Sequence, residues 1–166
     1  MGNFYLIGMP GCGKSTIGKE ISKKLGMVLI DADFYLEEKE KRKISDIFAQ
    51  DGEAQFRNLE TKYLKELSEN KNILISTGGG VILKEENTDI MKKSGKVIFI
   101  DTSCENILKN SSLLGRPLLK DDKNRIYNLY ELRYEKYIKS ADYIYKNDKD
   151  IKSAVEEISK FIIKNR

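Results

Sequence analysis

The sequence of 166 residues contains no histidine, two cysteines and two prolines. Without histidine the chain cannot build a Ser-His-Asp or Cys-His nucleophilic site or an HExxH zinc site, and it has no imidazole base. Two cysteines, Cys12 and Cys104, are too few for a disulfide framework or a cysteine-rich metal site. This cysteine usage is typical of a reducing compartment, and we predict a cytoplasmic protein.

Long hydrophobic runs are also missing. No apolar segment approaches the roughly 20 residues that span a bilayer, so we expect no membrane partner. The first residues, 3–7, are typical of a strand and not of a signal peptide. The 30 Lys and Arg and 26 Asp and Glu give a formal charge of +4. Because these charges are dispersed, as in the mixed run 39–43, nucleic acid is not an expected partner.

Short β-type runs alternate along the chain with longer amphipathic stretches, which predicts five strands and six helices. The predicted strands are 4–7, 28–30, 73–76, 97–100 and 143–145. The predicted helices are 14–25, 52–70, 84–93, 103–110, 122–138 and 151–164. This alternation indicates an α/β fold with a parallel sheet covered on both faces, and we expect a single domain over 1–166.

The segment from Gly8 to Ser15, GMPGCGKS, matches the phosphate-loop pattern G-x-x-x-x-G-K-[ST] between a predicted strand and a predicted helix. Its glycines let backbone N–H groups surround phosphate oxygens, and the helix start adds partial positive charge. Lys14 is placed to reach the β- and γ-phosphates of ATP, and the Ser15 hydroxyl to bind Mg²⁺. The competing interpretation is a glycine-rich turn with an exposed lysine. We interpret Cys12 as a small residue at a variable position, with a reactive thiol as the alternative.

Charged residues outside the loop suit an acceptor site. Asp31 and Asp33 follow the second predicted strand, where period-two alternation puts both carboxylates on one side of the ligand-binding sheet edge. One carboxylate suits Mg²⁺ and the other the proton of a substrate hydroxyl, while capping of the next helix is the competing interpretation. Arg57 and Glu60 are three residues apart on a predicted helix. The pair can present a guanidinium to a substrate carboxylate, or it is an exposed salt bridge.

Two loops have features of ligand contact. The glycine run at 78–80 ends the central predicted strand, which favours backbone amides facing a ligand, with a flexible turn as the alternative. The predicted loop at 110–123 contains Arg116. A mobile loop with one arginine can close over ATP and exclude water.

Four tyrosines form a stripe along the helix predicted at 122–138. They are spaced three, four and three residues apart, at Tyr127, Tyr130, Tyr134 and Tyr137. We interpret this stripe as core or pocket wall. Arg133 borders the stripe, where an arginine needs an anionic partner.

In this order the segments resemble the shikimate kinase family over essentially the full chain. They are GMPGCGKS at 8–15, DAD at 31–33, GEAQFRNLE at 52–60, TGGGV at 77–81, GRPLL at 115–119 and RYEKYIKSAD at 133–142. The resemblance implies a P-loop kinase fold, with a five-stranded parallel sheet flanked by helices, a substrate-binding helical segment at 32–61 and a mobile lid at 110–123. It implies ATP-dependent phosphorylation of the 3-hydroxyl of shikimate, on the route to chorismate and aromatic amino acids. We expect a monomer.

The resemblance also implies roles for single residues. The nucleotide-binding set is Gly11, Cys12, Gly13, Lys14, Ser15, Thr16 and Arg116. The metal-binding pair is Ser15 and Asp31, and the catalytic pair is Asp33 as base with Lys14. The substrate-binding set is Asp33, the backbone of Gly79, and Arg57 with Arg133 for the shikimate carboxylate.

Two features depart from the family pattern. Lys109 stands where the lid usually carries an arginine, and 146–149 lacks an arginine often found near the adenine. A lysine head group does not stack as a guanidinium does, so the adenine contacts stay open. The alternatives are an adenylate kinase, whose phosphate loop is similar, a gluconate-type kinase, which shares D-x-D, and a non-catalytic P-loop module. An ATPase acting on nucleic acid is a further alternative, although such a protein would need a stripe of basic residues that this sequence lacks.

Overall fold

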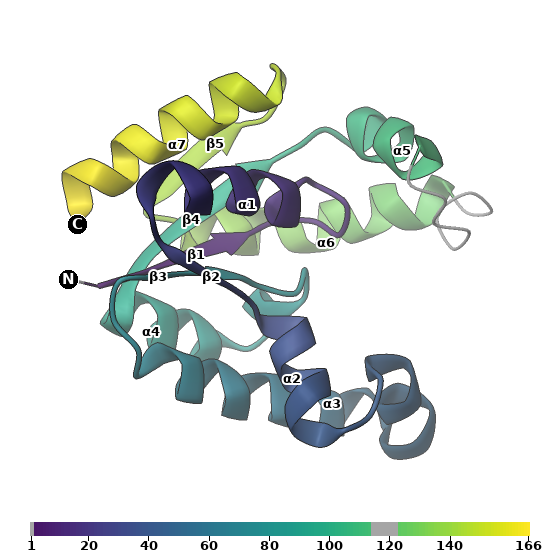
Figure 1. The fold of residues 1–166 in the computed structure, drawn as a ribbon. Coiled ribbons are helices and arrows are strands. Elements are labelled where there is room, and N and C mark those ends of the chain that lie inside the picture. Colours follow the sequence, from purple (N-terminus) through teal and green to yellow (C-terminus); the bar gives the residue numbers. More distant parts are fainter. Residues whose placement is uncertain (1, 114–122) are drawn as a thin grey trace.

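The computed structural model describes residues 2–113 and 123–166, and five of its strands form one sheet (Figure 1). The strands are β1 (Asn3–Ile7), β2 (Val28–Asp31), β3 (Ile73–Ser76), β4 (Gly95–Asp101) and β5 (Tyr143–Lys146). They lie in the order β2-β3-β1-β4-β5, and all neighbouring pairs are parallel. This confirms the predicted five-stranded parallel sheet. The sheet is parallel because helices cover its apolar strands on both faces.

Helices cover both faces of the sheet. They are α1 (Lys14–Leu25), α2 (Ala32–Glu40), α3 (Ile44–Ser68), α4 (Glu85–Ser94), α5 (Cys104–Leu113), α6 (Lys123–Ser140) and α7 (Ile151–Asn165), with a short 3₁₀ helix, η1 (Val81–Leu83). Figure 1 shows α1 and α7 on one face, and α3 and α4 on the other. None of the helices in the described parts of the chain combines the length and the apolar character needed to cross a membrane.

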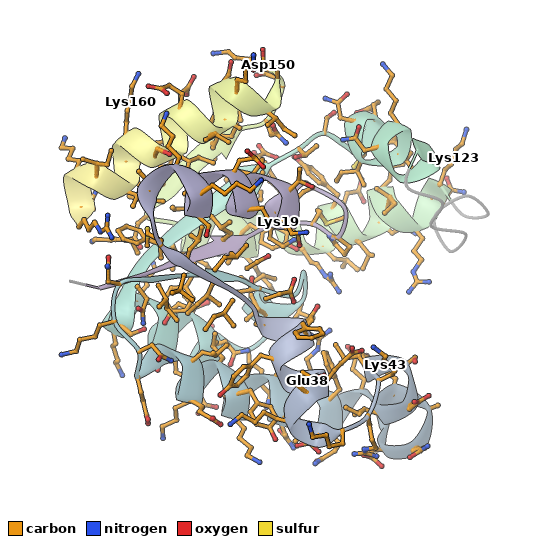
Figure 2. All side chains as sticks on the ribbon, viewed as in Figure 1. Lys19, Glu38, Lys43, Lys123, Asp150 and Lys160 are labelled. Atoms are coloured by element: carbon orange, nitrogen blue, oxygen red, sulfur yellow. The ribbon has the colours of Figure 1, made fainter. Side chains whose placement is uncertain are left out.

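The hydrophobic pattern did not predict helix α2 or the first turns of α3, although the family resemblance implied a helical segment at 32–61. Their hydrophobic pattern is weak, since α2 buries a single apolar side chain, Leu36. Lys41 ends α2 with a φ of 54°, and Gly52, with a φ of 84°, interrupts the helical path inside α3. The helix predicted to begin at 52 therefore begins at a real break in the backbone. We call α2 and the first turns of α3 the helical arm. Charged side chains, among them Glu38 and Lys43, cover its outer end (Figure 2).

The apolar side chains form two separate clusters. The main core surrounds the sheet, where β1 is fully buried along its length. The second cluster holds α2 against α3 and consists of Leu36, Ile47, Phe56, Leu59 and Tyr63. We name it the arm cluster. The sheet and the arm thus have their own packing, and the parallel strands bring their carboxyl ends to one edge, where ligands bind in such folds.

Candidate active site

The loop between β1 and α1 has the backbone of a phosphate cradle. Gly8, Gly11 and Gly13 have φ angles of 149°, 77° and 104°, a region that residues with a Cβ rarely adopt. Helix α1 begins directly after them, at Lys14. The amide groups of its first turn have no intrahelical acceptor, and the helix dipole adds positive charge there. The loop therefore offers N–H donors and positive potential to an anion.

The Lys14 ammonium lies inside this loop. The residue is 8% exposed, and Nζ donates hydrogen bonds to the carbonyl oxygens of Gly8 at 2.8 Å and Met9 at 3.0 Å. Its third neighbour is the sulfur of Cys12, at 3.6 Å. The interpretation as an exposed lysine on a flexible turn is wrong, because the charge is held at the centre of the loop.

The two carboxylate oxygens of Asp31 accept hydrogen bonds from different parts of the chain. Asp31 is the last residue of β2 and caps α2, with Oδ1 accepting from the N–H of Phe34 at 3.0 Å. Its other oxygen, Oδ2, accepts from Ser15 Oγ at 3.5 Å. The capping and the functional interpretation of this carboxylate are therefore compatible. Two oxygen donors of the kind that Mg²⁺ prefers stand beside the phosphate loop.

Asp33 lies on the first turn of α2 and not on a strand, so the period-two argument that placed it beside Asp31 was wrong. Both carboxylates nevertheless line one cavity, because the chain turns into α2 at Asp31. Burial raises the pKa of Asp33, the charge of Asp31 raises it further, and the charges of Lys14 and Arg57 oppose them. Asp33 is thus a more basic carboxylate than an exposed one.

The glycine run (Gly78–Gly80) touches three parts of the site. A Cβ on the first glycine would lie 2.8 Å from Asp33 Oδ1, and one on the second would lie 2.7 Å from Cδ of Pro10 in the phosphate loop. A Cβ on the third would collide with the guanidinium of Arg57. The carbonyl of the second glycine accepts a hydrogen bond from Tyr137 Oη at 2.5 Å. The glycines allow these three close approaches, which favours the interpretation as a ligand-contacting turn.

The predicted pair of Arg57 and Glu60 is confirmed, with Glu60 buried and Arg57 largely covered. Arg57 Nη1 donates to Glu60 Oε2 at 2.8 Å, and the two side chains are 13% and 8% exposed. Burial raises the pKa of Glu60, while the charges of Arg57 and Arg133 lower it. Arg57 Nε and Glu60 Oε1 are buried without a hydrogen-bond partner in the described part of the chain. The pair retains hydrogen-bonding capacity, and it differs from an exposed salt bridge.

The tyrosine stripe of α6 belongs to the core at three of its four positions, and none of the four lines the cavity described below. Tyr137 is buried and stacks on Phe99 of β4, with ring centroids 4.9 Å apart. Tyr130 and Tyr134 donate hydrogen bonds to the buried carboxylate of Asp101, at 3.1 and 3.5 Å. Tyr127 departs from the prediction because it is 41% exposed. Arg133, between these tyrosines, is half-buried.

A cavity of about 800 Å³ extends along the carboxyl edge of the sheet. Its walls include Pro10–Ile17, Asp31, Asp33, 76–79, Thr102, Asn106, Asn110, 147–149 and Ile151. Arg57 and Arg133 are not among these lining residues, and Arg57 reaches the site through its contact with Gly80. Arg116 and most of the predicted lid at 110–123 lie outside the described residues.

Three residues at this edge escaped the sequence analysis. Asp101 is the last residue of β4, Thr102 follows it, and Asn147 follows β5. Their position directly after predicted strands was the available signal, because such positions meet at one edge of a parallel sheet. No spacing pattern in the sequence marked them.

A parallel sheet with a phosphate loop after its first strand, two carboxylates after its second and a buried arginine–carboxylate pair defines a P-loop kinase that acts on a small molecule. The family model "Shikimate kinase" matches residues 10–163, and the chain belongs to the shikimate kinase family. It is therefore an enzyme, a transferase with ATP as co-substrate.

Individual relatives agree with the family match. Shikimate kinase of Clostridium botulinum (strain Alaska E43 / Type E3) is 48% identical over 161 residues, which cover 97% of each chain. The solved structure of shikimate kinase from Acinetobacter baumannii in complex with shikimate has a TM-score of 0.90 at 30% identity, covering 100% of this chain and 95% of that one. Shikimate kinase from Aquifex aeolicus has a TM-score of 0.82 at 39% identity, covering 98% and 97%. The family resemblance is confirmed over the other kinase classes considered.

The glycine run gives a first prediction. Gly80→Ala would place a methyl group against the Arg57 guanidinium, which can move because it is the end of a flexible side chain. We expect a folded protein whose affinity for shikimate falls about tenfold or more, since a charge-assisted contact is misplaced. Calorimetric titration with shikimate and with ADP measures this. Unchanged shikimate affinity, or equal loss for both ligands, would contradict the role of this contact.

Proposed function

We propose that the protein transfers the γ-phosphoryl group of ATP to the 3-hydroxyl of shikimate, and that the residues around the glycine run carry out this reaction. The observation that carries the proposal is the convergence of Asp33, Pro10 and Arg57 on Gly78–Gly80. A basic carboxylate, a phosphate loop and a buried guanidinium in contact with one short turn suit a substrate with both a hydroxyl and a carboxylate. Shikimate is such a molecule.

The nucleotide half of the site is the loop and the first turn of α1, residues 11–16. We propose that their N–H groups bind the β- and γ-phosphates and that Lys14 balances the charge that spreads over the transferring group. The buried position of the ammonium favours this role, because charge interactions are stronger away from water.

The metal site that we propose consists of Ser15 and Asp31. Within the described residues, no group of three or more acidic or cysteine side chains could hold a metal ion alone. One hydroxyl and one carboxylate, with Oγ and Oδ2 3.5 Å apart, fit Mg²⁺, which keeps most of its ligands from water and phosphate. When bound, Mg²⁺ supplies positive charge to the phosphate oxygens.

The acceptor half is proposed to use Asp33, Gly79, Arg57 and Arg133. Asp33 accepts the proton of the 3-hydroxyl, for which its raised pKa suits it, and the backbone of Gly79 contacts the ring. Arg57 and Arg133 bind the carboxylate, with Glu60 holding the Arg57 guanidinium in place. Alignment of the hydroxyl with the γ-phosphate is the main requirement of the reaction.

We further propose a monomer that works in the cytoplasm. Both cysteines are free and buried, which suits a reducing compartment.

The acceptor assignment is tested by measuring ADP release from ATP with shikimate, gluconate, AMP or DNA as the added compound. We expect turnover with shikimate to exceed that with the other compounds by orders of magnitude. Equal ADP release with and without shikimate would contradict the proposed function.

The carboxylate clamp gives a second prediction. Arg57→Ala and Arg133→Ala should each weaken shikimate binding by about 2–5 kcal/mol, the usual cost of truncating one partner of a buried charge pair. ATP binding should change much less. Arg166→Ala is the matched control. Arg166 follows α7 and donates a hydrogen bond to Asn72, and neither residue belongs to the proposed site. Titration calorimetry with each ligand checks the result. Normal shikimate affinity in both variants would mean that these arginines do not bind the carboxylate and are structural.

A further inference from the structure

The carbonyl oxygen of Cys12, in the middle of the phosphate loop, accepts two hydrogen bonds from distant parts of the chain. Thr102 Oγ1, after β4, donates at 2.8 Å, and Asn147 Nδ2, after β5, donates at 3.2 Å. Asn147 Nδ2 also donates to Thr102 Oγ1 at 3.0 Å. The loop after β1 and the residues that directly follow β4 and β5 thus meet at one peptide group.

Burial and backbone hydrogen bonds hold these two side chains in place. Thr102 is 2% exposed, so its hydroxyl depends on protein partners, and it has a donor role toward Cys12 and an acceptor role toward Asn147. The backbone N–H of Asn147 donates to the carbonyl of Asp101 at 2.8 Å, which fixes the start of the loop after β5. The two donors are therefore held rigidly in front of the Cys12 carbonyl.

The orientation of this carbonyl determines the orientation of the next amide. A trans peptide is planar, so the N–H of Gly13 points opposite to the C=O of Cys12. In the described residues, the Gly13 N–H has no hydrogen-bond acceptor. It is the amide that precedes the first turn of α1, and Gly13 lines the cavity.

Glycine alone does not fix this peptide. Gly13 has a φ of 104° and a ψ of 7°, and a glycine permits the preceding peptide plane to rotate at little steric cost. Rotation by half a turn would exchange an N–H for a C=O on the side of the phosphates, and a carbonyl oxygen repels a phosphate oxygen. The two donors oppose that rotation, because it would leave the buried Thr102 hydroxyl without its acceptor and would remove one of the two acceptors of Asn147 Nδ2.

We propose that Thr102 and Asn147 are positioning residues for the nucleotide, acting through the Cys12 carbonyl to keep the Gly13 amide turned toward the phosphates. The inference rests on the proposed function in one respect, that this loop binds ATP. It adds a link between the phosphate loop and the segment after β5, since Asn147, Asp148 and Lys149 line the same cavity.

The sharpest variant is Thr102→Val, which keeps the shape of the side chain and removes its donor. We expect the Kd for ADP, measured by titration calorimetry, to rise about tenfold. Thr102→Ser, which keeps the hydroxyl, should stay within about twofold of the parent protein, and so should the shikimate affinity of both variants. Asn147→Ala is the second variant, should Thr102→Val fail to fold, and its ADP affinity should fall likewise.

Thr88→Val is the matched control, because Thr88 forms its hydrogen bond, 3.0 Å long, with Ser140 on another helix. It should bind ADP normally, and thermal melts report any general loss of stability. Unchanged ADP affinity in Thr102→Val and Asn147→Ala would overturn the inference, as would an equal loss in Thr88→Val or an equal loss for shikimate. The unmodified enzyme is assayed first for ADP release with shikimate. Failure there contradicts the proposed function, whereas ADP binding by calorimetry tests the positioning role independently.

Discussion

Lys14→Ala is expected to lower kcat by about a thousandfold or more, because it removes the positive charge that we propose balances the transferring phosphoryl group. The ammonium is buried in the loop and bonds to the carbonyls of Gly8 and Met9. Its loss also removes one donor from each carbonyl, although that of Met9 still accepts from the N–H of Cys12, so the melting temperature should fall by a few degrees while the fold persists.

Lys19→Ala is the matched control, since Lys19 is an exposed lysine on the same helix, labelled in Figure 2. ADP release at saturating ATP and shikimate gives kcat for both variants, and circular dichroism melts establish that they are folded. Near-normal kcat in folded Lys14→Ala would remove the proposed mechanism. A comparable loss in Lys19→Ala would mean that general damage to α1 and not the missing charge is responsible.

Asp33→Asn is expected to lower kcat by roughly a hundredfold to ten-thousandfold, the usual contribution of a positioned general base, with a smaller change in the KM for ATP. Asparagine keeps the shape and one acceptor oxygen and removes the charge. Burial has already raised the pKa of this carboxyl, which makes the carboxylate a better proton acceptor. Asp89→Asn, at an exposed position of α4, is the control.

The pH profile and the Mg²⁺ dependence separate Asp33 from Asp31. Because the pKa of Asp33 is raised, its carboxylate is protonated as the pH falls through a value above the usual 3.8, and activity should be lost there. Asp33→Asn should abolish that limb of the profile. Asp31→Asn should instead raise the Mg²⁺ concentration needed for half-maximal rate. If Asp33→Asn kept most of kcat, Asp33 would be a binding residue, and identical behaviour of both variants would refute this division of roles.

The sheet and the phosphate loop were predictable because their signals are local. Five apolar runs and one glycine pattern lie within a few residues each, and a spacing of three was enough for the pair of Arg57 and Glu60. The hydrophobic pattern missed helix α2, which only the family resemblance implied, because this helix buries little and leaves Phe34 61% exposed. Thr102 and Asn147 were missed for another reason. They lie 90 and 135 residues from Cys12, and the relative placement of strand ends is a tertiary property.

The arm cluster has a consequence for how such enzymes can diversify. Asp33 and Arg57 stand on α2 and α3, whose mutual packing depends on that cluster. Lys14 stands on α1 and depends on the main core. Helix α3 also packs into the main core, through Leu64 and Leu67. Changes in the arm cluster can nevertheless alter the placement of Asp33 and Arg57 more directly than that of Lys14. A few apolar side chains outside the sheet are thus a target through which selection can change the acceptor half.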